Sequence, residues 1–238
     1  MSLTLIYTLL FLSAFLSGIS LLIFSKISPS KNLKLLLSFS GAFLLAICIL
    51  HLIPEIYVDY QKSTGLFILL GFLIQLILEV FSKGIEHGHI HLHPKPEVVF
   101  PYALFLSLFV HSVIEGMALN HSNIGVDFNN QSLLFGIIIH KIPIAIVLVT
   151  LLKANKLQNG LIITALTFFA LSAPMGLFLS DLYGEKHFGN PNFLIAIAVG
   201  VFLHISTTIL FETSENHKFN IKKYTIILLG LIAATLTL

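Results

Sequence analysis

The chain has 238 residues, of which 56% are hydrophobic and 10% are charged, whereas a soluble domain carries about 25% charged residues. This composition excludes an ordinary soluble protein and predicts a single transmembrane domain over residues 1–238, with the lipid bilayer as a partner. The formal net charge of +2, with no basic tract outside the apolar runs, argues against nucleic-acid binding.

Apolar runs of about 20 residues, the length that crosses a hydrocarbon core, recur along the chain. Unbroken apolar runs lack the alternation of barrel strands, so they predict an all-α, polytopic fold of eight transmembrane helices. Met1–Phe24 lacks the charged front and cleavage pattern of a signal peptide and is expected to remain as the first helix. The expected spans are Leu3–Phe24, Leu35–Ile53, Leu66–Phe81, Val99–Leu119, Leu133–Leu152, Leu161–Ser180, Phe193–Phe211 and Tyr224–Leu238.

Lysines predict the orientation, because cation-rich loops stay on the cytoplasmic side of a membrane. Loops after the first, third, fifth and seventh spans hold Lys26, Lys31, Lys34, Lys83, Lys95, Lys153, Lys156, Lys218, Lys222 and Lys223. The other loops hold only Lys62 and Lys186. Both termini are therefore expected on the non-cytoplasmic side of the cell membrane, or of the inner membrane if the source is a Gram-negative bacterium.

One short pattern occurs twice: Gly41-x-Phe43-Leu44 in the second span matches Gly200-x-Phe202-Leu203 in the seventh. The spans are an odd number apart and so run in opposite directions. This predicts an inverted repeat of helices 1–3 and 6–8 around helices 4–5, an arrangement that places a binding site near the midplane in many transporters. A chance match of common membrane residues is the alternative.

Polar residues at the outer end of the second span are candidates for a cation entrance. His51 and Glu55 flank Pro54 there. Their alternative interpretation is that of ordinary interfacial side chains. Later in the chain, Glu79 and His204 lie in the third and seventh spans, and His204 is interpreted as a satisfied interhelical histidine rather than as a ligand.

A histidine-rich segment lies between the third and fourth spans, in a loop of about residues 83–97 on the predicted cytoplasmic side. It alternates His87, His89, His91 and His93. Such tracts bind zinc, copper and nickel, so the loop is a candidate for receiving the ion after it crosses the membrane. Adventitious metal affinity of a surface loop is the alternative.

The fourth and fifth spans carry the strongest candidate site. Ionisable groups at bilayer depth are costly unless they face the protein interior, and each is therefore a functional candidate. His111 and Glu115 share one face of the fourth span, with Ser112 beside them, and His140 lies in the fifth. Two imidazoles and a carboxylate suit Zn²⁺. A polar contact that joins two helices is the alternative.

Prolines lie close to this candidate site. Lys141 follows His140 and precedes Pro143 by two residues, and the sixth span contains Pro174 and Gly176. A proline removes a backbone donor, so the sequence predicts a kink in the fifth span and a break in the sixth.

The string His111-Ser112-Val113-Ile114-Glu115-Gly116 resembles the His-Ser-x-x-Glu-Gly signature of the ZIP family of zinc and iron transporters. The resemblance extends over nearly the whole chain, to His140-Lys141-Ile142-Pro143, Gly41-x-Phe43-Leu44, His51-Leu52-Ile53-Pro54-Glu55 and Pro174-x-Gly176. It implies eight helices, outside termini and a His-rich cytoplasmic loop, as the lysines also predict.

By this resemblance, His111, Glu115 and His140 are metal ligands and Ser112 is a neighbouring polar residue. Many ZIP proteins carry an acidic residue where this chain has Lys141, a further ligand at Ile144 and a carboxylate near Ala173. Two-metal centres in the family depend on the acidic positions. The departures therefore imply a one-metal site beside Lys141.

These observations predict a secondary importer, not an enzyme, that carries Zn²⁺ as substrate, with Fe²⁺, Mn²⁺ and Cd²⁺ as further candidates. The chain has no GxxxxGK[ST] phosphate loop that would indicate ATP use. An intramembrane zinc hydrolase is the alternative, although no HExxH pair occurs. A metal-sensing receptor would need an output domain. The oligomeric state stays open, with a homodimer as one candidate.

Overall fold

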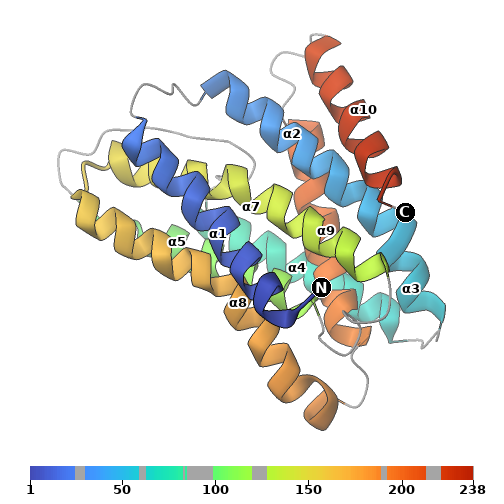
Figure 1. The fold of residues 1–238 in the computed structure, drawn as a ribbon. Coiled ribbons are helices and arrows are strands. Elements are labelled where there is room, and N and C mark those ends of the chain that lie inside the picture. Colours follow the sequence, from blue (N-terminus) through green and yellow to red (C-terminus); the bar gives the residue numbers. More distant parts are fainter. Residues whose placement is uncertain are drawn as a thin grey trace.

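The computed structural model describes residues 1–24, 30–58, 63–82, 84, 99–119, 128–188, 192–212 and 221–237, and every regular element in these ranges is a helix (Figure 1). The elements are α1 (Leu3–Ile23), α2 (Ser30–Ile47), η1 (Cys48–Leu52), α3 (Ile53–Val58), α4 (Thr64–Ser82), α5 (Tyr102–Met117), α7 (Phe128–Ala154), α8 (Asn159–Phe188), α9 (Asn192–Glu212) and α10 (Ile221–Thr235). The all-α prediction is confirmed.

Helices lie at all eight predicted span positions. In the described part of the chain, six helical segments are long and apolar enough to cross a membrane: Leu3–Ile23, Leu33–Val58, Thr64–Ser82, Gln131–Ala154, Asn159–Leu182 and Phe193–Phe211. The helices α5 and α10 are shorter, with 16 and 15 residues. At 1.5 Å per residue, α5 is about 24 Å long against a hydrocarbon core of about 30 Å. The chain is a polytopic membrane protein.

The second span changes its helical geometry just before Pro54. There η1, a π-helical turn, joins α2 to α3. Pro54 has no N–H to donate to the carbonyl of Leu50, and the N–H of Ile53 bonds to the carbonyl of Cys48, five residues back. The sequence shows the proline, but sequence analysis did not predict the wider helical turn that precedes it.

The predicted break in the sixth span is wrong. The helix α8 continues past Pro174, and α7 likewise passes Pro143 as one helix. In a membrane protein, packing against neighbouring helices and small local adjustments can compensate for the hydrogen bond that a proline removes. The neighbour of α8 at this point is α5, since Gly176 lies against the backbone of Val113.

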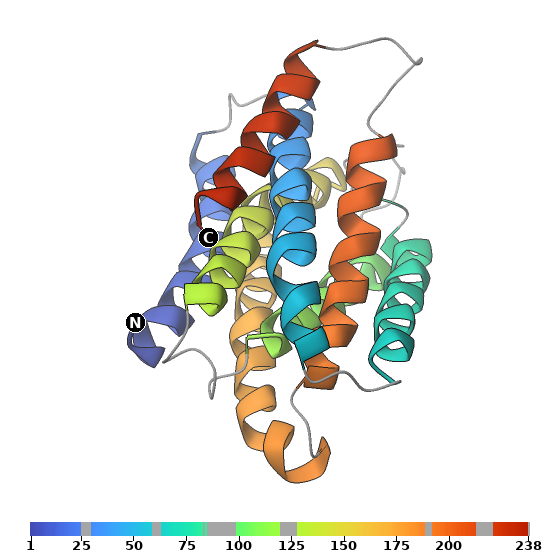
Figure 2. The ribbon, with the colours of Figure 1, turned by 90° about the vertical axis from the view of Figure 1, so that its right-hand side faces the viewer.

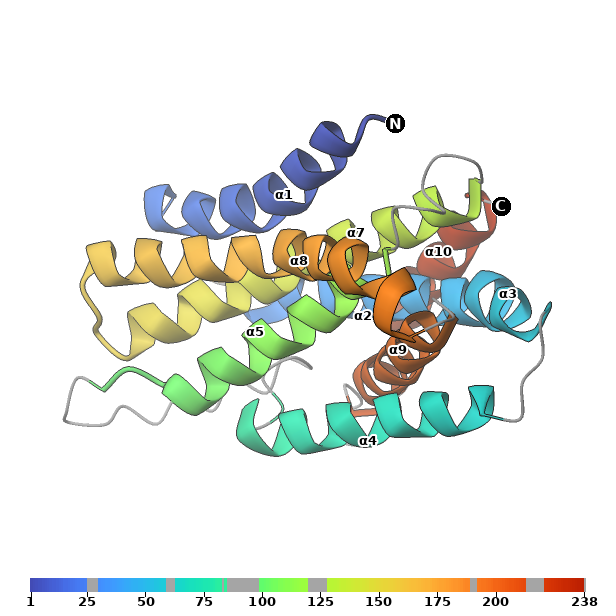
Figure 3. The ribbon, with the colours of Figure 1, turned by 90° about the horizontal axis from the view of Figure 1, so that it is seen from below.

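The most extensive helix contacts divide the molecule into two groups. In the first, which we call the site group, α5 packs on α8, α8 on α1 and α1 on α7. In the second, the flanking group, α4 packs on α9, α9 on α2 and α2 on α10. Figure 2 looks onto the flanking group, and Figure 3 shows α1 and α8 on the opposite side of the molecule from α4. The two groups meet mainly where α2 packs on α7 and α4 on α5.

The most extensive helix contacts follow the pattern that the predicted inverted repeat requires, although the α4–α5 contact has no α10–α7 counterpart of similar extent. In such a repeat, the first, second and third spans exchange places with the sixth, seventh and eighth, and the fourth exchanges with the fifth. This exchange turns the α1–α7 contact into the α8–α5 contact. The same exchange turns α2–α10 into α9–α4, and both contacts of each pair are present. The α1–α8 and α2–α9 contacts map onto themselves.

Two helix pairs approach each other closely at glycines. A methyl group added at Gly116 of α5 would overlap the carbonyl oxygen of Ala173 in α8, and one added at Gly176 would overlap that of Val113. The α4–α9 pair has the same kind of contact at Gly71 and Gly200. Small residues of this kind let helix backbones meet directly, as is common in membranes.

Candidate metal centre

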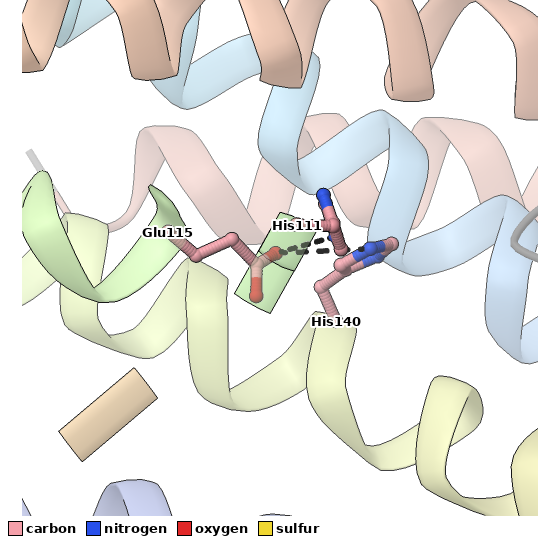
Figure 4. Close-up of side chains that lie close together, drawn as sticks. All are labelled: His111, Glu115 and His140. Atoms are coloured by element: carbon pink, nitrogen blue, oxygen red, sulfur yellow. Dashed lines mark ion pairs between the residues drawn. The ribbon is translucent and has the colours of Figure 1, made fainter. Parts of the chain in front are cut away.

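The helix α5 presents His111 and Glu115 on one face, because residues four apart lie about one turn apart. Both side chains are 1% exposed, and Nε2 of His111 lies 3.3 Å from Oε1 of Glu115. The carboxylate is thus held in the protein interior facing an imidazole nitrogen. Figure 4 shows the two side chains pointing toward the same space.

The helix α7 brings His140 to the same carboxylate oxygen. Its Nε2 lies 3.9 Å from Oε1 of Glu115, and its ring stands edge-on to that of His111, with centroids 5.9 Å apart (Figure 4). One ligand atom from each of the three buried residues lies within 4.8 Å of the other two. Bonds of about 2.0–2.2 Å to a tetrahedral Zn²⁺ separate the ligands by about 3.4 Å. The three atoms therefore need only small movements to share one ion.

The centre lies in a polar layer between two apolar clusters. Buried Leu108 of α5 belongs to one cluster and Ala118, which directly follows α5, to the other, with His111 and Glu115 between them. Along α7, His140 lies between Ile137 and Ile144 in the same way. The candidate ligands are therefore shielded by apolar packing on both sides along the helices, as expected for a site at mid-membrane depth.

Lys141 faces the other oxygen of the same carboxylate. Its Nζ lies 4.0 Å from Oε2 of Glu115, donates a hydrogen bond to Oγ of Ser112, and stands 4.7 Å from the centre of the Phe169 ring. The hydroxyl of Ser172 in α8 lies 2.5 Å from that of Ser112. Because a buried ammonium is costly unless charges and hydrogen bonds surround it, these contacts explain how Lys141 is accommodated at 1% exposure.

None of the other candidates within the described ranges is brought into this cluster. Among the described residues, it consists of His111, Glu115 and His140. His51 is buried in η1 and Glu55 is half-buried in α3. The loop histidines His87, His89, His91 and His93 lie outside the described residues.

His204 joins two helices, as the sequence predicted. Its Nε2 lies 3.3 Å from Oε2 of Glu79, which links α9 to α4, and its ring stands edge-on to Phe72 of α4. Apolar side chains occupy the two positions at which the resemblance implied a further ligand and a carboxylate. Both Ile144 and Ala173 are fully buried in the core.

Sequence reasoning missed two side chains that contact the histidines. Gln75 of α4 places Oε1 3.1 Å from Nδ1 of His111, and Ser40 of α2 places Oγ 3.5 Å from Nδ1 of His140. Gln75 carried a usable signal, because an amide inside the apolar run Leu66–Phe81 needs a partner in the protein. Ser40 carried none, since serines are common in membrane helices.

Two comparisons with known proteins bear on this centre. The family model of the ZIP zinc transporters matches residues 86–237, more than half of the chain, and this region contains the three clustered residues. Protein zntD of Dictyostelium discoideum is 29% identical over 152 residues, which is 58% of this chain and 22% of that protein. The chain thus matches about a fifth of the length of this curated relative.

Proposed function

Because this chain belongs to the ZIP zinc transporter family, a family of divalent metal transporters, we propose that it carries Zn²⁺ through His111, Glu115 and His140. The observation that supports this most is the convergence of two imidazole nitrogens and a carboxylate oxygen in a buried layer of a membrane protein. Imidazole also suits other divalent transition metals. Fe²⁺, Mn²⁺ and Cd²⁺ are therefore further candidate substrates.

The centre suits a transported ion better than a structural one. The three residues leave at least one coordination position of a four-coordinate zinc for water or a transient ligand. A site closed by four protein ligands would hold the ion too tightly for release. Glu115 is also the only carboxylate among the clustered residues that the structure describes, so no second one is available there as the general base of a hydrolase.

The proposed centre holds one metal ion. Oε1 of Glu115 faces both histidines, whereas Oε2 faces Lys141. An ammonium next to Oε2 occupies the place where a second cation would need an anionic ligand. Together with the apolar residues Ile144 and Ala173, this supports a mononuclear centre.

The proposed direction of transport is toward the cytoplasm. The lysine-rich loops support a cytoplasmic location for the ends of α1, α4, α7 and α9, with both termini outside. In the family-style mechanism, a motion of one helix group against the other exposes the centre to each side in turn. The sequence contains no phosphate loop for ATP, so transport is proposed to run down the metal gradient or to be coupled to another ion.

Uptake into sealed vesicles tests this function. Purified protein reconstituted with a zinc-sensitive dye inside should produce saturable Zn²⁺ entry, and competing Fe²⁺, Mn²⁺ or Cd²⁺ should slow that entry if they share the centre. Glu115→Gln should abolish entry, because it keeps the shape of the side chain and leaves a dication in a low-dielectric site without a counter-charge.

Glu79→Gln is the matched control for metal binding. It also removes a carboxylate that faces a histidine within the helices, but outside the three-residue cluster. We expect it to bind zinc at the core centre as the parent does. Zinc entry no faster than in protein-free vesicles, or normal binding and transport by Glu115→Gln, would refute the proposal.

A further inference from the structure

Each histidine of the centre contacts the flanking group through its second ring nitrogen. Nδ1 of His111 lies 3.1 Å from Oε1 of Gln75, and Nδ1 of His140 lies 3.5 Å from Oγ of Ser40. Both partners are fully buried. The two histidines belong to the site group, whereas Gln75 and Ser40 come from α4 and α2.

These contacts select the tautomer of each imidazole. The amide oxygen of Gln75 can only accept a hydrogen bond, so Nδ1 of His111 must carry the proton. The hydroxyl of Ser40 donates its proton to the carbonyl of Leu37, 3.0 Å away, so its oxygen is left to accept from Nδ1 of His140. In the neutral form of both rings the lone pair then lies on Nε2.

The selected nitrogen is the one that faces the centre. Nε2 of His111 and Nε2 of His140 lie 3.3 and 3.9 Å from Oε1 of Glu115. A metal ion accepts only a nitrogen with a free lone pair, and an outer hydrogen bond fixes both the tautomer and the orientation of a ligating ring. Gln75 and Ser40 thus hold both rings in the form that can bind a metal.

We propose that Gln75 and Ser40 are positioning residues of the metal centre, and that they couple its metal affinity to the position of the flanking group. This inference rests on the proposed binding of metal by His111, Glu115 and His140. Separation of the two groups breaks both contacts, and the histidines then lose their fixed tautomer and orientation. The centre binds metal most tightly in the arrangement described here and less tightly when the flanking group moves away.

Gln75 is tested by two substitutions of similar volume. In a background with His87, His89, His91 and His93 changed to alanine, zinc affinity is measured by competition with a chelator. Gln75→Met removes the acceptor and should weaken zinc binding about 10- to 100-fold, the usual effect of losing such an outer partner. Gln75→Glu keeps an acceptor and should restore affinity. The absorption spectrum of bound Co²⁺ should change in Gln75→Met and return in Gln75→Glu.

Ser40 has a matched control on the same helix. Ser38 and Ser40 are both buried, and each hydroxyl bonds to a backbone carbonyl of α2, that of Lys34 at 2.9 Å or Leu37 at 3.0 Å. Ser40→Ala should weaken zinc binding severalfold, while Ser38→Ala should not. If Gln75→Met fails to fold, this serine pair decides the question.

The outcomes separate the two proposals. If the parent binds no zinc at the core, the proposed function fails. If the parent binds zinc and both Gln75→Met and Ser40→Ala bind it with parental affinity, the positioning role is wrong and the function stands. Equal weakening by Ser38→Ala and Ser40→Ala would also overturn it, since loss of a helix hydroxyl would then explain the effect.

Discussion

At the scale of single residues, the two oxygens of Glu115 have different neighbours. Oε1 lies near Nε2 of His111 and Nε2 of His140, and Oε2 lies near the ammonium of Lys141. A carboxylate shared in this way can bind one dication through Oε1 while Lys141 remains in place. We therefore propose that the side chain at position 141 determines how many metals the centre holds.

We predict that the parent core binds one zinc per chain and that Lys141→Glu binds two. The substitution replaces the cation with a carboxylate beside Glu115, which supplies the anionic ligand that a second ion needs. Metal content is measured by mass spectrometry on protein with the four loop histidines changed to alanine. Two core ions in the parent, or one core ion in folded Lys141→Glu, would show that Lys141 does not determine the number of metal ions in the centre.

At the scale of helices, the contact between α5 and α8 fixes the position of the centre. Gly116 directly follows Glu115, and its face against Ala173 leaves no space for a methyl group. The helix α8 also carries Ser172, whose hydroxyl contacts that of Ser112, the residue that accepts a hydrogen bond from Lys141. Helix spacing and the geometry of the centre are therefore set by the same contact.

Gly116→Ala should lower the free energy of unfolding by about 1–3 kcal/mol, the usual cost of overpacking, because α5 must move away from α8. Gly160→Ala is the control, since a methyl group there meets nothing within 4 Å and alanine is the better helix former. The melting temperatures of both variants are measured by thermal unfolding of the purified proteins in detergent. Equal melting temperatures for Gly116→Ala and the parent would contradict the close packing.

Sequence patterns predicted the helices and the cluster because both depend on local spacing. Apolar run length defines a span, and the separation of four residues places His111 and Glu115 on one face. The partners Gln75 and Ser40 lie 36 and 100 residues from the histidines they contact, so their roles depend on helix packing. The continuity of α8 past Pro174 was mispredicted for the same reason, because neighbouring helices compensate for the proline.

At the scale of the whole molecule, the two ends of the bundle differ. Both termini lie toward the end that also contains α3 and the start of α4 (Figure 3). The C-terminal end of α1 and the segment between α7 and α8 lie at the opposite end, and the loops that follow α1 and α7 belong to the lysine-rich set. The positions of the termini and of the lysine-rich loops at opposite ends of the bundle thus agree with the lysine pattern on which loops share a side of the membrane.

Cysteine labelling tests the proposed orientation. The sequence has one cysteine, Cys48, and it is fully buried, so an introduced cysteine should report its own position. A membrane-impermeant thiol reagent added outside intact cells should label Leu236→Cys, at a residue that is 82% exposed near the C-terminus. It should label Ile90→Cys, beside His91, only after the cells are opened. The reverse labelling pattern would show that the proposed orientation in the membrane is wrong.

Glu115 and Lys141 carry opposite charges, so the pair contributes no net charge, and the pair together with a bound dication has a net charge of about two. A membrane voltage acts on each elementary charge with about 2.3 kcal/mol per 100 mV, or about 4.6 kcal/mol for two. An interior-negative cell would therefore draw the metal inward even without a concentration gradient. In vesicles with an imposed potassium diffusion potential, zinc entry should accelerate when the lumen is negative and slow when the potential is collapsed. A rate independent of voltage would mean that a counter-ion moves with each metal and that the transport cycle is electrically silent.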